Sequence, residues 1–242
     1  MRIGRFNFSP GLWPTLATLV LIPLLVSLGY WQLDRALWKQ ALVDSHAARA
    51  KQPTQSLTHL LDSGEPRDFV PVTAAGHYDI EQQLLLDNRI HQGAAGYQVL
   101  TPLVMDNAAG TVLVNRGWVP LGLSRAVLPP LPGPDGQLLV AGIMARLPER
   151  VFRLDAAEEQ HAGWPQVVQN IDFEDFERRL GYPLLPVIIQ LDKTTAQGFA
   201  RDWKPVYGIL PDKHRAYAMQ WFTLALVLFL IYVGVNSKRT ED

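Results

Sequence analysis

A charge-free run begins within Lys213-His214-Arg215-Ala216-Tyr217-Ala218-Met219-Gln220-Trp221-Phe222 and continues to Ser237. The 22 residues from Ala216 to Ser237 extend about 33 Å as an α-helix, and a hydrocarbon core is about 30 Å thick. The run therefore predicts a transmembrane helix over residues 216–237. His214 precedes it, between two cations, at the expected membrane boundary.

The residues around His214 leave two interpretations open. Tyr217, Trp221 and Phe222 follow it at helical spacing, and an imidazole above such an aromatic face can ligate a flat cofactor. The other interpretation is an interfacial anchor that holds the helix end at the membrane surface without binding a ligand.

A second charge-free run, Leu12 to Leu33, ends at Asp34 and predicts a first transmembrane helix over residues 12–33. A cleaved signal peptide is the alternative. We prefer an uncleaved anchor, because the apolar part of a signal peptide spans about 7–15 residues and no small-residue cleavage site follows here. The helix is expected to continue to about Arg49, before Pro53.

Trp31, Arg35 and Trp38 share one face of this continuation, because they are spaced at i, i+4 and i+7. The face is either an aromatic belt with a snorkelling arginine or a surface for a bound anion at the membrane edge.

Residues 34–213 are predicted to form a β-rich domain between the two spans. Asp172 and Gly181 bracket one short helix as its caps. The predicted class is a membrane-anchored α+β fold, with two transmembrane helices flanking a mostly antiparallel sheet or barrel-like domain. The predicted strands are Val70–Tyr78, Gln83–Arg89, Tyr97–Met105, Thr111–Val119, Leu138–Arg146 and Leu185–Asp192.

The strand Thr111–Val119 contains a cation among apolar residues. Strict alternation places Arg116 and Trp118 on one face with two valines. A buried cation needs a partner, either a carboxylate such as Asp87 or the acid group of a ligand.

The short tails are basic and predict the orientation in the membrane. We expect both termini in the cytoplasm and residues 34–213 in the periplasm of a bacterial inner membrane. The basic tail residues are Arg2, Arg5, Lys238 and Arg239.

Composition excludes several classes of function. The chain has no cysteine, which excludes disulfides, thiolate zinc sites and iron–sulfur clusters. A net charge of −1 gives no reason to expect nucleic acid as a partner. No nucleophile, phosphate-loop or metalloprotease motif is present, and the histidines other than His214 stand alone. We therefore expect a protein that is not an enzyme.

Four blocks carry a resemblance to a known family. Gly29-Tyr30-Trp31-Gln32-Leu33-Asp34-Arg35-Ala36-Leu37-Trp38-Lys39 resembles the Gly-x-Trp-Gln-x-x-Arg-x-x-x-Lys signature of the Surfeit-locus (Shy-type) cytochrome c oxidase assembly factors. The stretch from Val114 to Pro120 is similar to that family's central motif. His214-x-x-Tyr217-Ala218-x-Gln220-Trp221-Phe222 resembles the entry to its second span. Asp87-Asn88-Arg89, followed by Gly96-Tyr97, matches a further block.

The resemblance implies a factor for building haem–copper oxidase that binds haem a transiently and assists its insertion into subunit I. It also implies that His214 is the axial ligand of the haem iron. Haem a synthase or other assembly factors and the lipid bilayer are the further expected partners. Besides His214, the candidate cofactor-binding residues are Tyr217, Trp221, Phe222, Trp31, Arg35, Arg116 and Trp118.

Some of these roles are our own additions from residue chemistry. Arg35, Arg116 and Arg215 are candidates to bind the haem propionates, because guanidinium groups pair with carboxylates. The alternative function is a membrane scaffold that stabilises oxidase assembly intermediates without a cofactor.

Overall fold

A computed structural model shows two compact units, Met1–Ser45 with Pro205–Asp242 and His46–Lys204, and each is described by itself. Arg5, Arg146 and His161 lie outside the described residues. The described residues are 2–3, 6–64, 68–106, 109–122, 127–145, 163–196, 198–203 and 209–239.

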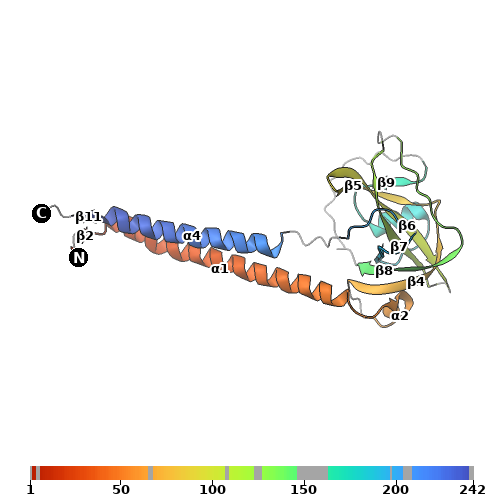
Figure 1. Cartoon of the computed structure of the whole chain (residues 1–242), viewed down its shortest axis with the longest axis horizontal. Helices are drawn as coiled ribbons and strands as arrows, with labels where there is room; N and C mark the ends of the chain where they lie inside the picture. The colour runs from red at the N-terminus through yellow and green to blue at the C-terminus, as the bar shows by residue number, and fades with distance from the viewer. Residues whose placement is uncertain are drawn as a thin grey trace. The chain divides into compact units, whose positions relative to one another are not determined.

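The first unit is a pair of helices. Helix α1 (Leu12–Arg49) and helix α4 (Pro211–Asn236) are both long and apolar enough to cross a membrane. Figure 1 shows them side by side, with the start of α1 beside the end of α4. The sequence predicted the charge-free parts of both helices. Because α4 begins at Pro211, however, His214 lies within its first turn.

Hydrogen bonds join the two helices at one end of the pair. Near the chain termini, the Gly11 amide donates to Asn236 Oδ1 at 2.9 Å, and the hydroxyls of Thr15 and Tyr232 are 2.9 Å apart. Beyond this end, a three-stranded sheet that the sequence did not predict joins β1 (Arg2–Ile3), β2 (Phe6–Phe8) and β11 (Ser237–Arg239).

Away from this end, the pair buries one glycine and three alanines, and these small residues let the two backbones approach. A Cβ atom added to Gly29 would lie 2.5 Å from Cε1 of Phe222. The Phe222 ring also meets Tyr30 edge to face, with centroids 5.4 Å apart. Phe222 therefore belongs to the contact between the helices. The small buried residues are Gly29, Ala36, Ala218 and Ala225.

The second unit is a β-domain whose sheet has the order β3-β4-β8-β10-β7-β6-β5-β9. An additional pairing of β4 with β6 closes five of these strands into a barrel. Two short helices complete the unit, α2 (Leu57–Asp62) and α3 (Phe173–Leu180). The strands are β3 (Gln55–Ser56), β4 (Val70–Tyr78), β5 (Leu84–His91), β6 (Ala94–Met105), β7 (Thr111–Pro120), β8 (Gln137–Ala145), β9 (Gln166–Val168) and β10 (Ile188–Leu191).

The α+β class predicted from sequence is confirmed, and the domain closes as a barrel. Alternate residues of all five ring strands pack together in its interior with two leucines of α2. The predicted caps of α3 are also confirmed, because Asp172 accepts from the Asp175 amide at 3.1 Å and Gly181 has a φ of 81°. The sequence analysis missed β3, β9 and α2.

A β-bulge interrupts β7 at Arg116. Val99 pairs with Gly117 whereas Leu100 pairs with Asn115, so Arg116 has no partner on β6. The extra residue shifts the alternation by one. Val119 consequently joins the cluster of Tyr97 and Val99, and Trp118 turns to the opposite face. The expectation that Arg116 and Trp118 share a face is therefore wrong.

The bulge requires glycine at position 117. Gly117 has a φ of +116°, and a Cβ atom there would lie 2.7 Å from the Ala200 carbonyl oxygen. The neighbouring segment pairs closely with β7, because Phe199 donates to the Arg116 carbonyl at 2.7 Å and Trp118 donates to Ala200 at 2.7 Å.

Replacing Gly117 with alanine is expected to lower the free energy of unfolding by about 1–3 kcal/mol through backbone strain, with a further loss from the collision with Ala200. Urea unfolding of the full chain in detergent, followed by tryptophan fluorescence, measures this. Gly136→Ala is the control, because Gly136 also has a positive φ but no atom lies within 4 Å of its added Cβ. Equal losses for the two variants would contradict the collision.

Replacing Gly29 with leucine is expected to disrupt the helix pair, because the new side chain meets Phe222 and overpacking costs about 1–3 kcal/mol. The native chain has no cysteine, so the distance between spin labels attached at Leu19→Cys and Leu230→Cys, two exposed positions, reports the pairing without background. Gly234→Leu is the matched control, since no atom lies within 4 Å of a Cβ at Gly234. An unchanged label distance in Gly29→Leu would show that this contact is dispensable.

Candidate functional site

His214 faces the first helix across the helix pair. Its side chain is buried, with 9% of the residue exposed, and Nδ1 lies 2.7 Å from Oε1 of Gln32. An amide oxygen can only accept a hydrogen bond, so this contact places the proton on Nδ1. Nε2 makes no hydrogen bond to a described residue. Nδ1 of the imidazole is thus engaged in a hydrogen bond, and Nε2 is available to bind a ligand.

The aromatic neighbours of His214 separate into two groups. Tyr217 is exposed and Trp221 is half-buried on α4, so both can border a ligand beside the imidazole. Phe222 instead packs over Gly29 and Tyr30. This differs from the expectation that Phe222 covers a cofactor, because its position one residue beyond Trp221 turns it toward α1.

The shared face of Trp31, Arg35 and Trp38 forms as predicted. The Arg35 guanidinium carbon lies 5.8 Å from the Trp31 ring centroid and 6.0 Å from that of Trp38. Both indoles are half exposed, and Arg35 makes no ion pair within the described part of the chain. The geometry suits an interfacial belt and an anion-binding surface equally.

Arg215, the other arginine near the helix entry, is engaged locally. Its guanidinium lies 2.8 Å from Oδ1 of Asp212. Both side chains are exposed, and such a pair contributes about 0–1 kcal/mol. A ligand carboxylate could therefore replace Asp212 as the partner of Arg215 at small energetic cost.

Arg116 lies deep in the second unit, with 2% of the residue exposed. It donates to Gln83 Oε1 at 3.2 Å and to the Pro132 carbonyl at 2.6 Å. Its guanidinium also lies 5.3 Å from the Tyr78 ring centroid and 4.9 Å from that of Phe199. Within the described part of the domain, the side chain therefore contacts neutral acceptors and aromatic faces in the interior.

Burial has the largest effect on the pKa values of Arg116 and Tyr78. Desolvation lowers the pKa of Arg116 below its usual value. Desolvation also raises the pKa of Tyr78 to about 12, although the nearby guanidinium of Arg116 opposes that increase. The Tyr78 hydroxyl stays protonated at neutral pH.

Trp118 serves a structural role on the opposite face. Its indole Nε1 donates to the Arg89 carbonyl at 2.8 Å, and its ring lies 5.1 Å from His91. Asp87, the carboxylate suggested as a partner for Arg116, accepts from the Asn88 amide at 2.7 Å. The two Trp118 contacts therefore link β7 to β5 across β6, whereas the hydrogen bond of Asp87 lies within β5.

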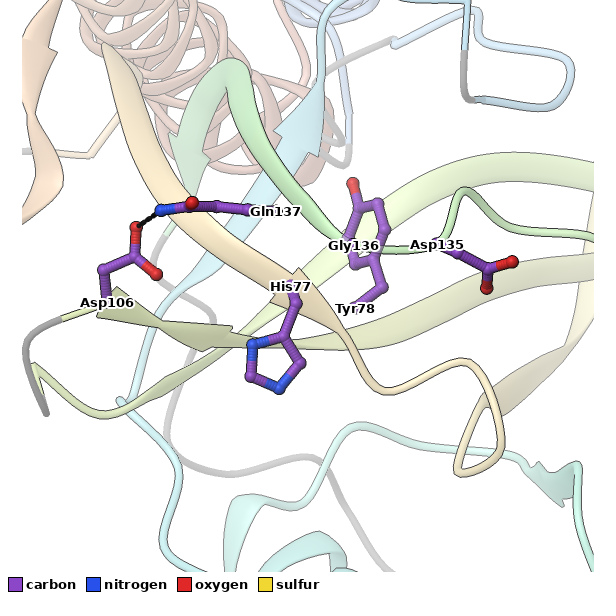
Figure 2. A pocket seen from close by; sticks show the side chains of 6 residues that line it. All are labelled: His77, Tyr78, Asp106, Asp135, Gly136 and Gln137. Atoms are coloured by element: carbon purple, nitrogen blue, oxygen red, sulfur yellow. Dashed lines mark hydrogen bonds between the residues drawn. The ribbon is translucent and has the colours of Figure 1, made fainter.

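One open pocket, of about 470 Å³, lies beside β4. Figure 2 shows that the side chains of His77, Asp106 and Asp135 point away from one another. Gln137 donates to Asp106 at 2.7 Å. Within the described ranges, no three His, Cys, Asp or Glu side chains gather as a metal site. This pocket therefore presents no convergent ligand set.

Gln32 is a site residue that was not predicted, although it lies within the Gly29–Lys39 motif. A polar side chain at the end of an otherwise apolar run was the available signal, because amides in such runs need an internal partner.

Comparison with known proteins places the chain in a family context. The sequence profile of the SURF1 family matches residues 19–226. A SURF1-like protein of Caenorhabditis elegans is 25% identical over 93% of this chain and 75% of its own length. A SURF1-like protein of Rickettsia felis is 26% identical over 90% of this chain and 94% of its own length. The cytochrome oxidase assembly protein SHY1 of Saccharomyces cerevisiae is 28% identical over 38% of this chain and 24% of its own length.

Replacing Arg116 with alanine is expected to destabilise the β-domain by at least about 1.5–3 kcal/mol, the value of hydrogen bonds to a charged group. The substitution leaves the buried Gln83 oxygen and Pro132 carbonyl without this donor. Urea unfolding of the full chain measures the loss. Arg178→Ala is the control, because Arg178 is exposed and pairs only with Asp175 in the described part of the chain. A stability unchanged from wild type would remove Arg116 from the structural core.

Proposed function

Because this chain belongs to the SURF1 family, we propose that it assists the assembly of cytochrome c oxidase by binding haem a at His214 and aiding its insertion into subunit I. The name of the yeast relative, a cytochrome oxidase assembly protein, supports the assembly role. The two apolar helices and the bacterial relative are consistent with an inner-membrane protein.

The haem proposal rests on the hydrogen bond that the His214 imidazole makes through Nδ1. Neutral imidazole is a common axial ligand of haem iron, and such ligands usually donate their other ring N–H to an oxygen. Gln32 accepts from Nδ1 in this manner, so Nε2 has the lone pair that a metal requires. The donor set therefore fits a haem group.

The surrounding residues have distinct proposed roles. Tyr217 and Trp221 border the macrocycle, whereas Phe222 supports it from within the helix pair. The exposed cations Arg35 and Arg215 bind propionates. When bound, haem a supplies the iron centre that the oxidase needs, and this chain holds it for transfer. Arg116 and Trp118 were also predicted as cofactor contacts, but their described contacts lie within the β-domain, so they have no role in this proposal.

The proposed setting is the bacterial inner membrane. Both termini lie in the cytoplasm and the β-domain lies in the periplasm, following the basic tails. Haem a synthase, or another assembly factor, delivers the haem, and binding is transient. The chain itself performs no catalysis in this proposal.

A scaffold without a cofactor is the second candidate, and the same hydrogen bond favours it. Gln32 and His214 join two membrane helices, and a scaffold needs such a join as much as a haem carrier does. In that case the imidazole serves helix pairing alone, and the purified protein is colourless while it still binds subunit I.

The test is a visible spectrum of the full chain purified from cells that make haem a. We expect a Soret band in the wild type and its loss in His214→Ala. His77→Ala is the matched control, because His77 is an exposed histidine on β4 in the other unit. A band of equal intensity in His214→Ala would remove His214 as the ligand, and colourless wild-type protein that retains subunit I would favour the scaffold.

A further inference from the structure

We propose that Gln32 is a positioning residue for His214, because its side-chain oxygen holds the imidazole in the Nδ1–H tautomer and leaves Nε2 as the metal-binding atom. The metal-binding part of this statement rests on the proposed function. The tautomer part rests on the helix pair alone and can be measured without haem.

The geometry supports a fixed tautomer. Oε1 of Gln32 lies 2.7 Å from Nδ1 of His214, which is a short distance for a hydrogen bond from nitrogen to oxygen. The nitrogen that carries the proton is set by the hydrogen bond that the ring makes. An oxygen acceptor at Nδ1 therefore selects Nδ1–H.

The surroundings of Gln32 keep its amide in place. Gly29 and Ala36, one turn away on either side, are the two buried residues of α1. On the other helix, His214 and Ala218 are buried one turn apart. These small neighbours let the backbones approach, so the hydrogen bond lies in a partly buried contact between the helices.

The hydrogen bond is not required to hold the two helices together. Thr15 and Tyr232, with Gly11 and Asn236, join them at the opposite end. Phe222 packs on Gly29 between the two ends. Because pairing is secured elsewhere, a polar side chain at position 32 has its main consequence at the imidazole.

The first experiment determines the tautomer in the full chain without haem. The protein carries ¹⁵N-labelled histidine, is placed in lipid nanodiscs and is studied at about two pH units above the usual imidazole pKa of about 6.5. The His214 signals are assigned by their loss in His214→Ala. We expect a protonated Nδ1 and a bare Nε2 in the wild type, and a protonated Nδ1 in Gln32→Glu, which keeps an acceptor oxygen.

Gln32→Leu is expected to release the tautomer, so that Nε2 becomes partly or fully protonated. Thr15→Ala is the control for a general loss of interhelical hydrogen bonding, and the Nδ1–H tautomer persists in it. A protonated Nε2 in the wild type, as an inverted Gln32 amide would give, overturns the proposal. So does an unchanged tautomer in Gln32→Leu.

The second experiment titrates the same proteins with haem a. Loss of a partner that orients a ligand weakens metal affinity by about 10–100-fold, and we expect this in Gln32→Leu but not in Gln32→Glu or Thr15→Ala. Equal affinities for Gln32→Leu and the wild type would overturn the link to the metal. If no variant binds haem while the tautomers behave as expected, the proposed function fails and the assignment of Gln32 as the residue that orients the imidazole stands.

Discussion

The hydrogen bond between Gln32 and His214 fixes the orientation of the imidazole that lies between two otherwise apolar helices. An amide or an imidazole that turns into the contact between two helices gives up part of its hydration and needs a partner within the protein. They find each other at 2.7 Å. The contact engages Nδ1 of His214, in the first turn of α4, and leaves Nε2 as the only ring nitrogen available to a metal.

The β-domain depends on a different local constraint, the single extra residue in β7. The bulge at Arg116 directs its guanidinium into the domain interior, where Gln83, Pro132 and two aromatic rings receive it. Gly117 makes the bulge possible because its φ of +116° is strained for residues with a side chain. The sequence around Arg116 suggested a ligand-binding residue, but the contacts described for Arg116 stabilise the domain.

The sequence predicted the architecture well where simple periodicity governs it. The two long apolar helices, the bounds of β4 and the caps of α3 followed from charge-free length, alternation and capping residues. The bulge was not predictable, because strict alternation assumes that each residue of β7 pairs with one residue of β6. The role of Gln32 was missed because a hydrogen bond over 182 positions of the chain leaves no local pattern. The pairing of β4 with β6, which closes the barrel, is likewise a long-range contact.

Electron–nuclear double resonance of the ferric haem complex, with histidine labelled by ¹⁵N at Nε2 only, tests the central assignment most directly. We expect a strong ¹⁵N coupling in the wild type that disappears in His214→Ala, because Nε2 of His214 would be bonded to the iron. A haem complex of the wild type without ¹⁵N coupling from Nε2, or with coupling unchanged in His214→Ala, would contradict the assignment.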